Sequence, residues 1–153
     1  MGYNFLPSEI SAAFALEQIK KLNNNIKIRV KNFNYLYNFF KHFSHIFKLP
    51  KQHSYVKTGW LAFPLVIRKE SKIKRKNLQI YLEQNGIQTR TIFTGNILRQ
   101  PGFKNIQCRG NADDFSIADE VMRGGILLGC HHGLNDGLLD HIHSSFKDFL
   151  ERY

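Results

Sequence analysis

One stretch of this 153-residue chain gathers side chains of the types that bind phosphate groups. It runs from Thr89 to Phe103, at the end of a predicted strand, and holds two arginines, an amide and two flexible glycines. These residues are Arg90, Arg99, Asn96, Gly95 and Gly102. Guanidinium groups donate paired hydrogen bonds to phosphate oxygens. The segment indicates either an anion-binding loop or an ordinary charged surface, and the residues alone leave both interpretations open.

Histidines and aspartates are concentrated near the C-terminal end, and both are ligand types for zinc or iron. They are His131, His132, His141, His143, Asp136 and Asp140. At helical spacing Asp136, Asp140 and His143 share one face opposite an apolar stripe, so a solvated polar face explains them, and we predict no metal site. His132 follows an apolar strand, where it could point into a cleft at the sheet edge, but an ordinary loop histidine is the simpler interpretation.

The sequence has none of the motifs that assemble a nucleophile, a zinc protease site or a phosphate cradle. GxSxG, HExxH, the P-loop and GxGxxG are all missing. Cys108 and Cys130 lack CxxC spacing, so we expect free thiols. We therefore nominate no catalytic residue and expect the chain to act as one part of a larger enzyme.

The net charge of +10 is unevenly distributed, because no Asp or Glu occurs between Gln18 and Lys69. Aromatic residues are interleaved with this charge, which raises the hypothesis of a polyanion partner. Their spacing also suits a buried helix face and no recognition motif accompanies them, so we do not expect nucleic-acid binding. The longest apolar run, Trp60 to Ile67, is far shorter than a membrane span, and we expect a cytoplasmic protein.

Two helices are predicted in the first part of the chain. Ser8 is a suitable N-cap for a helix that reaches about Leu22 and is apolar nearly all round, which suggests that a partner surface is missing. Asn23, Asn24 and Asn25 are predicted to break it, and a second helix follows from Ile26 until Leu49 and Pro50. We assign residues 1–50 to a helical segment.

We predict three strands in residues 51–153, and each is followed by a helix. A long loop precedes the helix after the second strand. The strands are Trp60–Ile67 with Pro64 at an edge or bulge, Ile87–Phe93, and Ile126–Cys130. The helices lie near residues 73–85, 112–123 and 135–149; Gly86 stops the first and Asn135 caps the last. The last helix is expected to bury Leu138, Leu139, Ile142, Phe146 and Phe149. The fold class is α/β (α+β-like): two helices, then a small three-stranded sheet with helices.

Several segments resemble the sugar-nucleotide aminotransferases of the DegT family. The opening residues 2–22 are similar to that family's GYN…EI.AA segment, and the later residues 118–119 and 129–134 fit its closing strand and helix. Residues 86–90 with 93–103 resemble the branch that includes the CDP-4-keto-6-deoxyglucose 3-dehydratases. The resemblance runs in order through essentially the whole chain.

This resemblance implies the C-terminal small domain of an aspartate aminotransferase fold, in an enzyme that uses pyridoxal phosphate or pyridoxamine phosphate on a nucleotide-linked keto sugar. The family's Schiff-base lysine, or the histidine that replaces it in the dehydratases, belongs to an upstream cofactor domain with no matching motif here. We expect the chain to be a truncated part, inactive and without tight cofactor binding alone. The alternative is a stand-alone, non-catalytic module that binds nucleotide sugar or pairs with another subunit.

The resemblance also assigns roles to single residues. Asn4, with Tyr3 beside it, is expected to reach the cofactor phosphate of a homodimer partner, although Leu6 replaces a residue that is basic in many relatives. The expected substrate-binding residues are Arg90, Asn96 and Arg99 on the substrate side of the cleft, and His131 and His132 near its rim. The first helix is expected to pack on the cofactor domain and the dimer partner.

Overall fold

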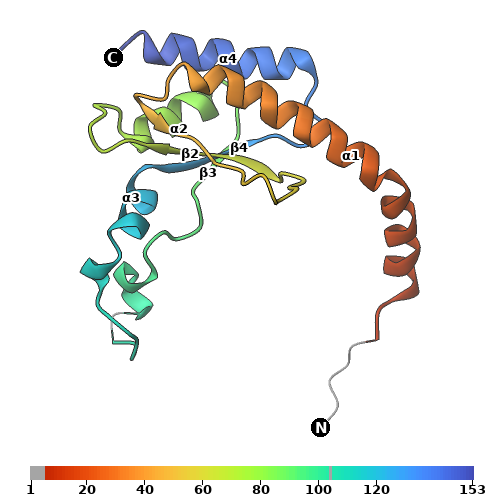
Figure 1. The fold of residues 1–153 in the computed structure, drawn as a ribbon, viewed down its shortest axis with the longest axis horizontal. Helices are drawn as coiled ribbons and strands as arrows, with labels where there is room; N and C mark the ends of the chain where they lie inside the picture. The colour runs from red at the N-terminus through yellow and green to blue at the C-terminus, as the bar shows by residue number, and fades with distance from the viewer. Residues whose placement is uncertain (1–5, 104) are drawn as a thin grey trace.

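The computed structural model describes residues 6–103 and 105–153 (Figure 1). In these two ranges, four helices and a small sheet are joined by loops that contain three short 3-10 turns. In chain order the elements are α1 (Glu9–Lys41), β1 (Phe47–Lys48), β2 (Ala62–Ile67), α2 (Arg75–Gln84), β3 (Thr89–Arg90), η1 (Ile97–Arg99), η2 (Pro101–Phe103), η3 (Ala112–Asp114), α3 (Ser116–Gly124), β4 (Gly125–Gly129) and α4 (Asp136–Leu150).

The sheet has the order β1-β2-β4-β3, and all neighbouring strands are antiparallel. The pairing of β2 with β4 is the longest, and alternate residues of β2 (Phe63, Leu65 and Ile67) are buried. Strand β1 pairs only with Val66 and Ile67, so Pro64 has one paired neighbour, Leu127 on β4. The predicted edge position of this strand is wrong, because β2 lies between β1 and β4. Pro64 is nevertheless tolerated, because β1 is too short to pair with it and one side of the strand is unpaired there.

Helices α1, α2 and α4 lie together over the sheet, while α3 lies apart from them beside the strand ends (Figure 1). The core between these layers is rich in aromatic rings. Phe40 of α1 packs edge-on against Phe146 of α4 with ring centroids 4.8 Å apart, and its centroid lies 5.5 Å from that of Phe63 on β2. Phe33 stacks on Trp60 at 3.8 Å. The second half of α1 thus shares one core with the sheet and α4; the predicted division of the chain at residue 50 stays a prediction.

The prediction of two N-terminal helices is wrong, because α1 continues without a break from Glu9 to Lys41. Asparagine costs only about 0.5–0.7 kcal/mol per residue relative to alanine inside a helix, far less than proline. The three consecutive asparagines therefore lower helix stability without ending the helix, since no residue there supplies a left-handed C-terminal stop. The predicted cap at Ser8 is confirmed: its hydroxyl accepts a hydrogen bond from the Ser11 amide at 3.2 Å.

The sheet also differs from its prediction. The short strand β1 was not expected, and the predicted strand from Ile87 to Phe93 is reduced to β3. Its only partner, β4, offers Leu127 and Leu128 as pairing positions, so the chain leaves the sheet after Arg90. The predicted α+β-like combination of helices with a small sheet is otherwise observed, and Gly86 has the expected left-handed conformation, with φ of 73°.

The polar face of α4 is solvated as expected at Asp136 and Asp140, which are exposed, but the expectation is wrong for His143, which is half-buried. Lys31 on α1 forms an ion pair with Asp136 at 2.8 Å, and the Tyr35 hydroxyl donates to Asp140. The His143 ring lies between two aromatic rings of α1, 4.6 Å from Tyr35 and 4.0 Å from Phe39. The expected burial is also wrong for Leu138, which is 45% exposed in the first turn of α4.

The first half of α1 projects away from the rest of the molecule (Figure 1). Its large apolar side chains are all at least half exposed: Ile10, Phe14, Leu16, Ile19 and Leu22. Monomeric soluble proteins rarely expose a continuous apolar surface of this kind. Among the described residues, no helix has both the length and the apolar character needed to cross a membrane. The exposed half of α1 therefore has the character of a contact surface.

This surface predicts self-association of the isolated chain. Light scattering should show a mass that rises with protein concentration, and the double variant Ile10→Glu, Phe14→Glu should shift the chain towards the monomer, because both residues lie on one exposed helix face. Lys21→Glu, on the same exposed half of α1, is the control and should leave association unchanged. A monodisperse wild-type monomer with one sharp, cooperative thermal transition would contradict the prediction.

The aromatic enclosure of His143 predicts loss of stability in acid. Burial lowers the pKa of His143, with a smaller contribution from Lys147 that the opposing effect of Asp140 exceeds. The unfolded chain then binds a proton at higher pH than the folded chain, so the stability is complete above the unfolded pKa of about 6.5 and is lost as the pH falls through the folded pKa.

The urea midpoint should therefore fall between about pH 7.5 and about pH 5 less steeply in His143→Phe, which keeps an aromatic ring between Tyr35 and Phe39. His45→Gln, at an exposed histidine, is the control and should keep the wild-type slope. Equal slopes for wild type and His143→Phe would show that His143 is not the titrating group.

Candidate functional site

A groove of about 510 Å³ lies where the ends of β3 and β4 meet the start of α4. Arg90 on β3 and His131 after β4 both line it, so the structure brings together two of the residues predicted to bind substrate. Its apolar lining includes Leu61, Leu127, Leu134 and Leu138. A guanidinium and an imidazole beside an apolar wall suit a ligand with both an anionic and an apolar part.

The two basic residues of the groove are held differently. The Nδ1 atom of His131 accepts a hydrogen bond from the Gly133 amide at 3.1 Å, so in the neutral imidazole the proton lies on Nε2, which can donate to a ligand. The His131 carbonyl accepts from the Asn32 side chain of α1 at 2.9 Å, and this contact fixes the loop. Arg90 is exposed, and its side chain makes no hydrogen bond or ion pair with the other described residues. Its guanidinium is therefore available for an anion.

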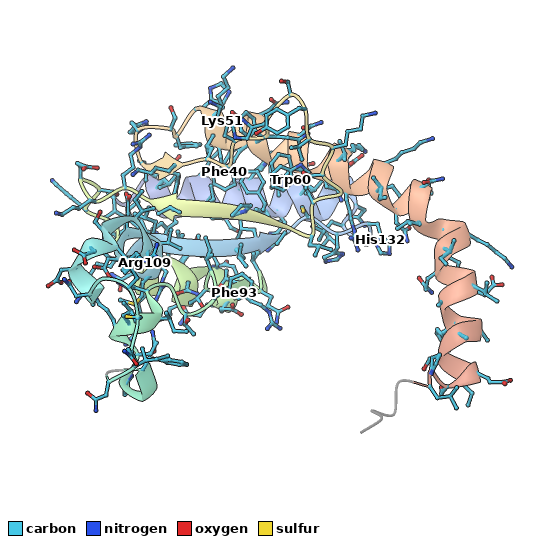
Figure 2. All side chains as sticks on the ribbon, turned by 60° about the horizontal axis from the view of Figure 1, so that its bottom comes forward. Phe40, Lys51, Trp60, Phe93, Arg109 and His132 are labelled. Atoms are coloured by element: carbon cyan, nitrogen blue, oxygen red, sulfur yellow. The ribbon has the colours of Figure 1, made fainter. Side chains whose placement is uncertain are left out.

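His141 also lines the groove and was not predicted as a site residue. A ring nitrogen of His141, Nε2, lies 2.8 Å from the carbonyl oxygen of Asn85, which follows α2. Since this contact joins two elements 56 residues apart, no local sequence pattern signals it. His132, by contrast, is exposed and does not line the groove; it lies on the loop after β4, towards α1 (Figure 2).

Asn96 and Arg99 form a second cluster with Asp119 of α3. Arg99 grips the Asp119 carboxylate with two hydrogen bonds of 2.7 Å, from Nε and Nη2, and Nη2 also donates to Asp113 at 2.8 Å. Asn96 is 2% exposed, and its side-chain amide donates to Asp119 and to the Ala112 carbonyl, both at 2.9 Å. Hydrogen bonds from Arg99, and then from Asn96, hold the pKa of Asp119 below its ordinary value.

This cluster fastens the loop after β3 to α3. Both N–H donors of the Asn96 amide are used inside the protein, and its oxygen accepts from the Leu98 amide at 3.2 Å. The structure thus gives Asn96 and Arg99 a clear part in shaping the loop. Their direct contact with substrate stays a prediction, as does that of His132. Tyr3 and Asn4, the predicted cofactor-binding residues, lie outside the described residues.

The described residues do not themselves fit pyridoxal phosphate. A Schiff-base lysine needs an enclosed site in which its ammonium can lose a proton. Every lysine in residues 6–103 and 105–153 is exposed, and none lines the groove beside Arg90 and His131. No group of three potential metal ligands occurs in these ranges either. The side chains that line the groove are therefore of types that bind and orient a ligand.

Comparison with known proteins agrees with this picture. The model of the DegT/DnrJ/EryC1/StrS aminotransferase family matches residues 1–147. The chain is 29% identical over 150 residues to the lipopolysaccharide biosynthesis protein RfbH of Salmonella typhimurium, covering 98% of this chain and 34% of that protein. It is 33% identical over 133 residues to the GDP-4-keto-6-deoxy-D-mannose 3-dehydratase of Escherichia coli O55:H7, covering 85% and 33%. The chain spans about a third of the length of these curated relatives.

Solved structures show the same fold. A GDP-4-keto-6-deoxymannose-3-dehydratase with a trapped PLP-glutamate geminal diamine has a TM-score of 0.81 at 30% identity, covering 95% of this chain and 37% of that one. An aminotransferase from Psychrobacter cryohalolentis has a TM-score of 0.85 at 10% identity, covering 99% and 41%, and is similar in fold alone. The predicted small-domain fold of a pyridoxal-phosphate transferase is thus confirmed, and the chain belongs to the DegT/DnrJ/EryC1/StrS aminotransferase family.

Proposed function

We propose that this chain forms the substrate-facing wall and a subunit contact of a pyridoxal-phosphate enzyme that removes the 3-hydroxyl of a nucleotide-linked keto sugar. The observation that carries the proposal is the likeness to a 3-dehydratase structure along 95% of this chain, at 30% identity and a TM-score of 0.81. The names of the relatives place such enzymes in deoxysugar and lipopolysaccharide biosynthesis. The cytoplasm, where nucleotide sugars are made, is the proposed location.

The groove supports this function because part of its lining is basic and part is apolar. A nucleotide-linked sugar combines a diphosphate with less strongly hydrated sugar and base parts. Arg90 can bind a phosphate oxygen through charge-assisted hydrogen bonds, while Nε2 of His131 can donate to a sugar or phosphate oxygen. Leucines on β4 and at the start of α4 exclude water from one side of the ligand. In this proposal the chain binds and orients substrate.

The cofactor and the reacting centre belong to other parts of the proposed assembly. Pyridoxal phosphate supplies the electron sink for such chemistry when it is bound. The described residues of this chain offer no enclosed lysine for it, so we propose that the chain is inactive alone. The exposed half of α1 supports packing against a cofactor domain and a second subunit, because its apolar residues have no cover within the described structure. A homodimer is the proposed state.

Nucleotide binding to the groove tests the proposal. In an amide NMR titration with GDP and dTDP, we expect saturable shifts at residues 86–90 and 127–134. Arg90→Ala should weaken binding about 10-fold or more, because a hydrogen bond to a charged group contributes about 1.5–3 kcal/mol. The control is Arg109→Ala, which removes the same charge from an exposed loop position outside the groove (Figure 2). Absence of shifts in the groove, or equal weakening by both variants, would overturn it.

A further inference from the structure

Phe93 combines two unfavourable features that the fold does not explain. Its φ angle is 46°, and it is the only residue other than glycine with a positive φ among those the structure describes. Left-handed backbone is strained for a residue with a bulky side chain. The ring is also 90% exposed, more than any other large apolar side chain in the described ranges (Figure 2). Strained, exposed residues cluster at functional sites when the surrounding structure enforces them.

The surrounding structure does enforce this conformation. On the N-terminal side, the Thr91 hydroxyl donates to the carbonyl of Phe93 at 3.1 Å. On the C-terminal side, Gln100 donates to the Thr94 carbonyl at 3.0 Å. Gly95 has a φ of 69° and lies so close to α3 that an added Cβ would be 2.2 Å from the Cβ of Met122. The backbone is thus held at Phe93 itself and at the two residues that follow it.

The cluster around Asp119 completes this clamp. Asn96 and Arg99 follow Phe93 by three and six residues, and both are hydrogen-bonded to the Asp119 carboxylate. Every one of these contacts holds backbone or polar groups, and none involves the Phe93 ring. The ring is neither part of the hydrophobic core nor paired with another aromatic side chain in the part of the chain that the structure describes. The Phe93 backbone is therefore fixed while its ring stays exposed and available for contact with a ligand.

The neighbouring charge indicates what that ligand is. Arg90, three residues before Phe93, has an exposed guanidinium with no partner among the described residues and lines the groove. Phe93 itself does not line the groove. Three residues span at most about 11 Å from Cα to Cα, so the backbones of Arg90 and Phe93 lie within about the length of one nucleotide, and a ligand held by Arg90 can extend out of the groove towards Phe93. A cation and an aromatic ring are the combination by which proteins bind nucleotides, with a base stacked on the ring and a phosphate on the cation.

We propose that Phe93 is a specificity-determining residue that stacks on the nucleobase of the substrate while Arg90 binds its phosphate. This inference rests on the proposed function, because it assumes a nucleotide-linked ligand in the groove. Stacking accepts any base face, so Phe93 selects for the presence of a base and against base-free sugar phosphates. The strain at φ 46° keeps the ring in place before the ligand binds.

A tryptophan placed at this position reports stacking directly. The fluorescence of Phe93→Trp should be quenched saturably by GDP and dTDP and unaffected by inorganic pyrophosphate. The matched control is Ile117→Trp, at a 76% exposed position on α3. The native Trp60 is stacked on Phe33 and provides a constant background in both variants. Equal, non-saturating quenching of both variants, or quenching by pyrophosphate, would overturn the inference.

Measuring GDP affinity in variants of Phe93 distinguishes the effect of the aromatic ring from that of the strained backbone. Phe93→Asn keeps a residue that tolerates positive φ but removes the ring, and should weaken GDP binding about 10-fold, whereas Phe93→Tyr should bind as wild type. Phe93→Gly should lose affinity equally while its melting temperature stays the same or rises, because glycine relieves the strain. A lower melting temperature in Phe93→Gly would instead show that the ring serves the fold.

The two proposals fail in different ways. If GDP shifts the groove residues around Arg90 and His131 but Phe93→Asn binds as tightly as wild type, the inference about Phe93 is wrong and the proposed function stands. If GDP produces neither shifts in the groove nor quenching at Phe93→Trp, both are wrong. If GDP and pyrophosphate bind with equal affinity, the groove recognises phosphate but not the base, and the inference about Phe93 is wrong.

Discussion

The contact of α1 with the sheet and α4 through aromatic rings is the constraint on which the rest of the structure depends. Phe40 touches both Phe63 on β2 and Phe146 on α4, and Phe33 adds a stacked contact with Trp60. Large aromatic side chains contribute most of the burial energy of a small core. Because these contacts begin only near Phe33, they fix the second half of α1 and make its first half a projecting arm.

The same anchoring extends to the candidate site through α3 and β4. An added Cβ at Gly124 would lie 2.5 Å from the Ile67 carbonyl, so this glycine lets α3 approach β2 and pass directly into β4. Asp119 on α3 then holds Arg99 and Asn96 of the loop after β3. The position of Phe93 thus depends on the contacts of its loop with α3, and that of Arg90 on the pairing of β3 with β4, although neither side chain belongs to the core.

The sequence predicts correctly those features that depend only on residues close to one another in the chain. The caps at Ser8 and Asn135 and the stop at Gly86 depend on neighbouring backbone groups only, and all three are observed. Features that depend on distant partners escape such prediction. The length of β3 is limited by β4, and the half-buried position of His143 depends on Tyr35 and Phe39 of α1. The exposure of Phe93 was hidden by an alternating pattern typical of a strand.

This chain supplies polar groups to the candidate site, but it leaves apolar surfaces on either side of the sheet exposed. The exposed half of α1 and the loops around α3 project from two sides of the sheet (Figure 1). Apolar side chains are exposed on both sides, among them Phe14 on α1 and Ile117 on α3. Polar contacts to a ligand are weak while water competes for them and strengthen when water is excluded. On the proposed function, a body that covers both apolar surfaces would therefore strengthen the hold of Arg90 and His131 on substrate without contributing a polar group of its own.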